Sequence, residues 1–168
     1  MSRLDSVIRR LMAQRSCLDL AATLIKDFDG VVLEFGLGNG RTFDHLQTLM
    51  PQREIFVFER VVAAHPDCIP DSDHLILGDI YKTLPYAINT LQSSVILVHS
   101  DVGSHDKDKN RKITEFMSVN LPPLLKPGAI IVSEQQMLVA GSEDVELPKD
   151  VAPGRYYITR VGHPTAVP

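Results

Sequence analysis

The sequence predicts a single doubly wound α/β domain with a mostly parallel sheet. Five short apolar runs, each about as long as one strand, alternate with segments of helical periodicity. A glycine-rich turn follows the first of these runs. In open α/β sheets such a turn lies at the carboxyl edge of the strands, where ligands bind. The 168 residues are enough for one domain with its own hydrophobic core.

The segment before the glycine turn is predicted to be helical. Ser2 and Asp5 have capping-box spacing, and apolar residues then recur at helical intervals until Asp29-Gly30. Residues 3–28 therefore form one long amphipathic helix or two short ones. Four arginines lie on its early polar side in an otherwise acidic chain: Arg3, Arg9, Arg10 and Arg15. They form either a solvated helix face or a cap over a ligand cleft that meets an anionic substrate.

The stretch from Val31 to Arg41 reads V-V-L-E-F-G-L-G-N-G-R. It predicts a buried strand at 31–35, a tight turn, and a helix at 41–50 that Pro51 ends. Glycine adopts positive φ and has no Cβ, so a ligand can approach the backbone of the turn. Free N–H groups at the start of the helix point into the same space. The alternative is a plain strand–turn–helix corner without a ligand.

The remaining elements follow in an alternating order. The predicted strands are 54–59, 74–79 (which includes the residues where the chain leaves the strand), 95–98 and 129–134. The predicted helices are 85–92 and 106–120. Pro85 limits the first of these helices and Pro122-Pro123 ends the second. After Glu134 we expect a strand at 155–161 and a weaker one within 136–147. The end of the chain is therefore predicted to be a trimmed antiparallel edge without a helix.

The glycine turn resembles the first motif of the class I, Rossmann-like S-adenosylmethionine (SAM)-dependent methyltransferases, E-x-G-x-G-x-G. Glu34, Gly36, Gly38 and Gly40 fill its four positions. The resemblance covers about residues 31–134. It implies that the glycines admit the amino-acid end of SAM and that Glu34 orients it.

This resemblance also divides the predicted domain, residues 1–168, into three parts. They are an N-terminal helical cap (1–29), a cofactor-binding core (31–134) and C-terminal edge strands (135–168).

Two further acids stand at strand ends. A carboxylate at Glu59 can accept hydrogen bonds from both hydroxyls of a ribose, and the resemblance implies that role. A strand-end carboxylate facing water is the alternative. The resemblance also implies that Asp79 receives the adenine amino group and that Ile80 packs on the adenine face. A pair such as Gly78-Asp79 is common in turns for conformational reasons alone.

The predicted reaction is an in-line displacement at the SAM methyl group, in which the protein aligns the acceptor and takes a proton. Candidates for the proton acceptor follow the fourth strand: His99, Asp101, His105 and Asp106. We rank His99 first, because its unperturbed pKa suits the task, and Asp101 second. A lone histidine at a strand end is, however, more often structural.

We predict no metal site. Asp101 and Glu134 stand near the places where some O-methyltransferases hold Mg²⁺, and carboxylate oxygens suit that ion. The chain has no D-x-D before the loop and no Asp-Asp or Asp-Asn pair after the fifth strand. Solvated carboxylates are therefore the preferred interpretation.

Charge and motifs favour a small-molecule acceptor and argue against nucleic acid. The net charge is −4, and the N-P-P-[YF] motif of many nucleic-acid methylating enzymes is absent. Cys17 and Cys68 lack metal-ligand spacing and suggest reduced thiols in a cytoplasmic protein. No apolar run has membrane-spanning length, so no membrane partner is expected. The short chain can close little of its substrate site, and we expect a homodimer or higher homo-oligomer.

Two other functional classes fit the pattern. One is a non-catalytic module that binds SAM or its product without turnover. The other is an NAD-dependent oxidoreductase, for which Glu59 would equally suit a ribose. The third glycine of G-x-G-x-x-G would fall at Arg41, which counts against the dinucleotide fingerprint. No G-K-[ST] follows the turn, so the P-loop pattern fails too.

Overall fold

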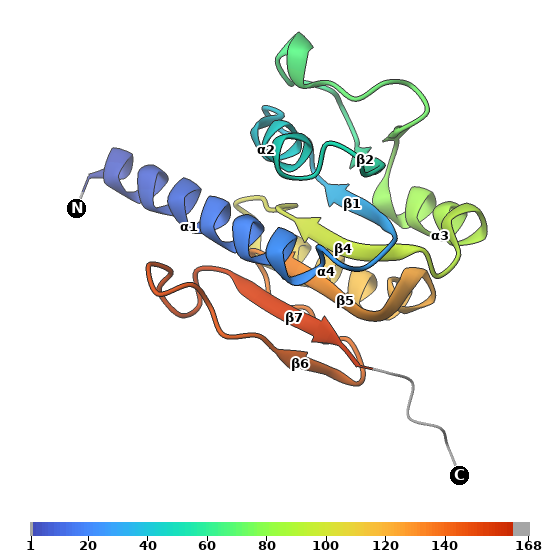
Figure 1. Cartoon of the computed structure of the whole chain (residues 1–168). Coiled ribbons are helices and arrows are strands. Elements are labelled where there is room, and N and C mark those ends of the chain that lie inside the picture. Colours follow the sequence, from blue (N-terminus) through green and yellow to red (C-terminus); the bar gives the residue numbers. More distant parts are fainter. Residues whose placement is uncertain (1, 163–168) are drawn as a thin grey trace.

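A seven-stranded sheet in the order β3-β2-β1-β4-β5-β7-β6 runs through the centre of the molecule (Figure 1). The computed structural model describes residues 2–162. Strands β1 to β5 pair in parallel, whereas β7 is antiparallel to both β5 and β6. The strands are β1 (Val31–Phe35), β2 (Ile55–Glu59), β3 (Leu75–Leu77), β4 (Val95–Ser100), β5 (Leu125–Ser133), β6 (Ser142–Asp144) and β7 (Tyr157–Val161).

Helices cover both faces of the sheet (Figure 1). They are α1 (Arg3–Leu24), α2 (Arg41–Leu49), α3 (Ile80–Leu91) and α4 (Lys107–Asn120), with short 3₁₀ turns η1 (Pro66–Cys68) and η2 (Pro122–Leu124). α1 packs beside α2 on one face, and α3 packs beside α4 on the other. Residue 1 and residues 163–168 of the predicted domain lie outside the described residues.

The core lies where β1, β4 and β5 run side by side. Every residue of β4 is buried, and the five C-terminal residues of β5 are buried as well. Helices exclude water from both faces of these strands, so their sequences are continuous apolar runs rather than alternating ones. The doubly wound fold with a mostly parallel sheet and an antiparallel C-terminal edge, predicted from those runs, is confirmed.

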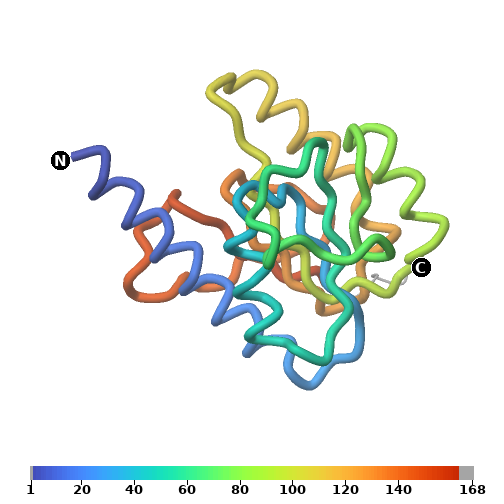
Figure 2. Tube along the Cα trace, turned by 90° about the horizontal axis from the view of Figure 1, so that it is seen from above, coloured from blue at the N-terminus to red at the C-terminus, as the bar shows by residue number. Residues whose placement is uncertain are grey.

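α1 is one continuous helix that begins with the predicted capping box. The Ser2 side chain accepts the Asp5 N–H, and the Asp5 carboxylate accepts the Ser2 N–H. The helix ends at Leu24, four residues before the predicted end at 28. Its second half packs on the sheet, whereas its first half extends beyond the body of the molecule (Figure 2).

Two further predicted boundaries were wrong for local reasons. α3 begins at Ile80 rather than near 85, because the Asp79 side chain caps it by accepting the Tyr81 N–H. Pro85 in the second turn removes one backbone hydrogen bond without ending the helix. β5 begins at Leu125 rather than 129, since Leu125 already pairs with Val95 before a shift in register.

We predict that Arg53→Ala lowers the free energy of unfolding by about 1–3 kcal/mol. The Arg53 guanidinium donates to the carbonyls of Ile25, Phe28 and Gly30, at 2.9, 2.6 and 3.0 Å. It thereby fixes the connection between α1 and β1, and its loss removes three hydrogen bonds, although the Ile25 carbonyl still accepts the Phe28 N–H. Urea unfolding measures the change.

Arg111→Ala is the matched control for this experiment. Among residues 2–162, Arg111 forms ion pairs only with exposed Asp108 and Glu115 on α4, and such surface pairs contribute less than about 1 kcal/mol. Equal effects of the two substitutions would contradict the role of Arg53.

Candidate active site

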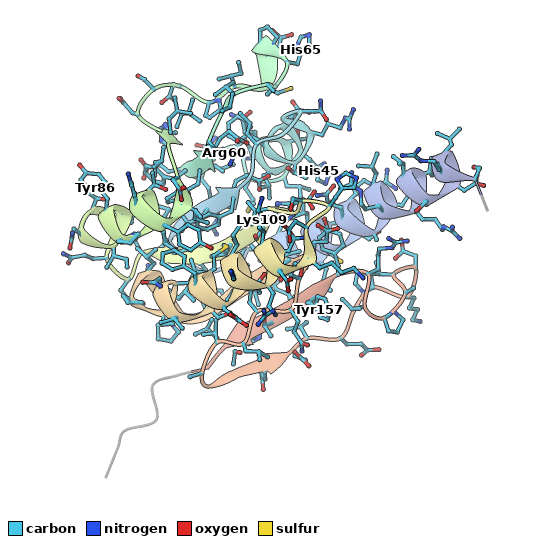
Figure 3. The ribbon with its side chains drawn as sticks, turned by 180° about the vertical axis from the view of Figure 1, so that it is seen from behind. His45, Arg60, His65, Tyr86, Lys109 and Tyr157 are labelled. Carbon is cyan, nitrogen blue, oxygen red and sulfur yellow. The ribbon has the colours of Figure 1, made fainter. Side chains whose placement is uncertain are left out.

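A cavity of about 800 Å³ opens at the carboxyl ends of β1 to β4. Chain order reverses between β1 and its neighbour β4, and ligands of open α/β sheets bind at such a reversal. The walls come from the turn after β1, the ends of β2 and β3, the loop after β4, and residues of α1 and α4. Figure 3 labels two of the wall residues, Arg60 beyond the end of β2 and Lys109 on α4.

The three motif glycines have positive φ but meet different surroundings. A Cβ at Gly38 would have no atom within 4 Å, and Gly38 lines the cavity. A Cβ at Gly36, which also lines the cavity, would lie 3.2 Å from Cγ1 of Val102. Gly40 faces away, and its Cβ would lie 2.4 Å from the Cβ of Cys68. Gly36 and Gly38 therefore shape the cavity, whereas Gly40 permits packing behind the turn.

Glu59 ties the glycine turn to the end of β2. Its Oε2 accepts the N–H groups of Leu37 and Gly38 at 2.8 and 3.2 Å. Its Oε1 accepts those of Arg60 and Val61 at 2.7 and 3.1 Å. Partial burial opposes ionisation, but the four backbone hydrogen bonds outweigh it and lower the pKa of Glu59. An ionised carboxylate therefore lines the cavity beside the turn.

Asp79 and Ile80 line the cavity at the end of β3. Oδ1 of Asp79 accepts the Tyr81 N–H at 2.9 Å, which caps α3. Among the described residues, no hydrogen bond engages Oδ2 of Asp79, which stays available to a ligand donor.

Glu34 and His99 form a buried hydrogen-bonded pair near the carboxyl ends of β1 and β4. Both side chains are 0% exposed, and Nδ1 of His99 lies 2.7 Å from Oε2 of Glu34. The Thr42 hydroxyl donates to Oε1 of Glu34. Burial lowers the pKa of His99, but the charge of Glu34 and the hydrogen bond to it raise the pKa more. Neither His99 nor Glu34 lines the cavity.

Asp101 lines the cavity and fastens α1 over it. Oδ2 of Asp101 accepts hydrogen bonds from Arg10 at 3.0 Å and from Gln14 at 2.9 Å. Glu134 stands nearby at the end of β5, where burial and then the negative charge of Asp101 raise its pKa. Arg10 lines the cavity, but the other three arginines of the predicted cluster do not.

His105 and Asp106 do not line the cavity. The Asp106 side chain caps α4 by accepting the N–H groups of Asp108 and Lys109, and His105 is exposed. Sequence reasoning missed Gln14. Its signal is a polar residue on the helix face that otherwise presents Ala13, Cys17 and Leu18 to the core.

The described residues contain no group of three or more His, Cys, Asp or Glu side chains that could hold a metal ion. Within the same residues, no helix is both long and apolar enough to cross a membrane.

The chain is similar to known proteins. A family model described as S-adenosyl-L-methionine methyltransferase matches residues 1–161. A solved S-adenosyl-L-methionine methyl transferase from Silicibacter pomeroyi is 42% identical, with a TM-score of 0.90. That match covers 96% of this chain and 99% of the other. No curated protein matches.

Two more distant structures share the fold. One is fibrillarin in a fibrillarin/Nop5p complex, with 17% identity, a TM-score of 0.54, and coverage of 90% of this chain and 83% of the other. The second is an O-methyltransferase family protein from Burkholderia thailandensis, with 10% identity and a TM-score of 0.51. It matches over 88% of this chain and 56% of its own.

We predict that Gly38→Val abolishes binding of S-adenosylhomocysteine, the demethylated form of SAM. The valine side chain would project into the cavity, in space that the natural glycine leaves open for the ligand. Titration calorimetry measures the loss, and thermal unfolding reports whether the variant is folded. Normal affinity in this variant would show that the ligand does not approach the turn.

Gly141→Val is the matched control. Gly141 also has positive φ, and a Cβ there would also have no atom within 4 Å, but it does not line the cavity. Both substitutions carry a similar backbone strain, about 1–2 kcal/mol. Only the valine at position 38 should affect ligand binding.

Proposed function

This chain belongs to the S-adenosyl-L-methionine methyltransferase family, and we propose that it methylates a small-molecule acceptor. The observation that carries the proposal is one continuous cavity of about 800 Å³ that includes Gly38, Glu59, Asp79 and Asp101. A space of that size accommodates drug-sized ligands. It leaves room for a small acceptor beside the cofactor.

The proposed cofactor pose follows the strand ends. The amino-acid end of SAM lies against Gly36 and Gly38, and the ribose hydroxyls bind Glu59, where they replace the 3.2 Å bond from Gly38. Asp79 accepts the adenine amino group through its second oxygen, and Ile80 packs on the adenine face.

Glu34 and Gly40 act from behind the cavity wall in this proposal. Glu34 accepts a hydrogen bond from Thr42, which does line the cavity, and so orients the cofactor through that residue. Gly40 lets the turn pack against Cys68.

Asp101 is the better candidate to receive or orient the acceptor. The acceptor atom forms a bond to the methyl carbon as the sulfur–methyl bond breaks, S-adenosylhomocysteine leaves, and the acceptor gives up a proton. Asp101 faces the cavity, where its Oδ2 accepts from Arg10 and Gln14, and a side-chain hydrogen bond also joins Asp101 to Glu134. His99, ranked first from the sequence, is fully buried against Glu34. A buried position suits a residue that supports Glu34 better than one that takes a proton from the acceptor.

A labelling experiment tests the acceptor class. Purified protein and SAM with a radioactive methyl group are incubated separately with small-molecule, RNA and protein fractions of one cell extract. The proposal predicts label in the small-molecule fraction that depends on intact Gly38. Label confined to RNA or to protein would contradict it.

We predict that Glu59→Ala weakens S-adenosylhomocysteine binding by about 1–3 kcal/mol, because the ribose loses a charged hydrogen-bond acceptor. Glu54→Ala is the control, since Glu54 is exposed just before the same strand and does not line the cavity. Calorimetry on both variants gives the comparison. An unchanged dissociation constant for Glu59→Ala would place the ribose elsewhere.

We propose that the protein forms a homodimer in the cytoplasm. The first half of α1 exposes apolar side chains at helical spacing: Leu4, Val7, Ile8 and Met12. The same stretch of α1 contributes Arg10 and Leu11 to the cavity wall, so a second copy on this stripe would also cover the cavity mouth. Free Cys17 and Cys68 suit a reducing compartment.

Light scattering at micromolar concentration should therefore report a dimer for the natural chain. Ile8→Lys should report a monomer, because it places a charge on the apolar stripe. Val119→Lys, at an exposed apolar site on α4, is the control and should stay dimeric. A monomeric natural chain would contradict the proposed homodimer.

A further inference from the structure

The cavity is lined by more positive than negative side chains, in a chain whose net charge is −4. Five cationic side chains line it, and they are Arg10, Arg41, Arg60, Lys109 and Lys112. Three anionic side chains line it, and they are Glu59, Asp79 and Asp101. The cavity wall therefore differs in sign from the rest of the molecule.

Neighbouring side chains neutralise only some of these cations. Arg10 is paired with Asp101 at 3.0 Å, and Lys109 lies 3.7 Å from the exposed carboxylate of Asp106. Among residues 2–162, the side chains of Arg41, Arg60 and Lys112 form no ion pair. Positive charge is left over on the cavity wall after pairing within the protein.

The cofactor does not supply the missing negative charge. SAM carries a sulfonium and an ammonium against one carboxylate, so it brings a further positive charge into the cavity. Like charges close together in a partly enclosed space repel. An anion on the second ligand would offset this excess.

The α4 wall offers the best place for such an anion. Lys109 and Lys112 lie three residues apart, so they share one face of α4, and both line the cavity with Ile113. Leu11 on α1 and Tyr81 on α3 supply apolar and aromatic surface to the same cavity. The Tyr81 ring packs against Phe116 of α4 with centroids 4.6 Å apart, which fixes the ring beside this wall.

We propose that the acceptor is a small anionic molecule with an apolar or aromatic body, whose carboxylate or phosphate group is held by Lys109 and Lys112. This inference rests on the proposed function, because it assigns the part of the cavity that the cofactor leaves open. It assigns the anion contact to α4 and not to the α1 arginines, for which such a contact was one of two interpretations, since Arg10 is already paired with Asp101.

The test measures ligand binding to protein saturated with S-adenosylhomocysteine. The probes are benzoate and phenyl phosphate, the neutral benzamide, the cationic benzylamine, and a ten-nucleotide single-stranded RNA. Protein-observed NMR titration gives each dissociation constant. We expect the two anions to bind about tenfold more tightly than benzamide, as charge-assisted hydrogen bonds allow.

Two double variants locate the anion. Lys109→Gln with Lys112→Gln should weaken benzoate and phenyl phosphate binding about tenfold, for the same loss of charge-assisted contacts. Lys107→Gln with Arg111→Gln removes the same charge from α4 residues that do not line the cavity, and should change little. Equal loss in both variants would reduce the effect to general surface charge and overturn the proposal.

The remaining outcomes separate this inference from the proposed function. Equal or tighter binding of benzamide or benzylamine would overturn the anionic acceptor and leave the cofactor site intact. RNA that binds at the two lysines more tightly than either small anion would replace it with a nucleic-acid acceptor. Failure of the natural chain to bind S-adenosylhomocysteine would remove the proposed function, and the acceptor site with it.

Discussion

The buried hydrogen-bonded pair of Glu34 and His99 is the constraint on which the site depends. The two residues are register partners on β1 and β4, at the point where strand order reverses. Both are 0% exposed, and Thr42 at the start of α2 donates to the same carboxylate. A buried charge left without its partner costs about 3–5 kcal/mol. The pair therefore locks β1, β4 and α2 together and fixes where the glycine turn leaves the sheet.

Carboxylates at neighbouring strand ends then perform different tasks. Glu59 gathers four backbone N–H groups and so holds the glycine turn against β2. Asp101 holds Arg10 and Gln14, which brings α1 over the same cavity. These contacts place the cofactor wall and the cap around one space from segments far apart in the sequence. SAM, the family's cofactor, suits a wall that offers backbone N–H groups and carboxylates.

The sequence predicted the sheet well, because apolar runs are local signals. The glycines and strand-end acids are also local signals, and their roles at the site stay predictions. Gly36, Gly38, Glu59, Asp79, Ile80 and Asp101 all line the cavity. Contacts between segments far apart in the sequence could not be predicted from these local signals. Nothing in the motif shows that Glu34 is covered by His99, or that the α1 arginines divide into one cavity residue, Arg10, and three others. The start of α3 was missed because the Asp79 cap outweighs Pro85, a balance that local patterns do not rank.

Calorimetric titration of the purified chain with S-adenosylhomocysteine, with NADH run under the same conditions, tests the central claim most directly. The claim is that the cavity at the β1–β4 reversal is a SAM site built on the glycine turn. It predicts saturable micromolar binding of S-adenosylhomocysteine and no binding of NADH. Binding of NADH alone would assign the site to a dinucleotide. Binding of neither ligand would leave the glycine turn as a structural corner and contradict the account.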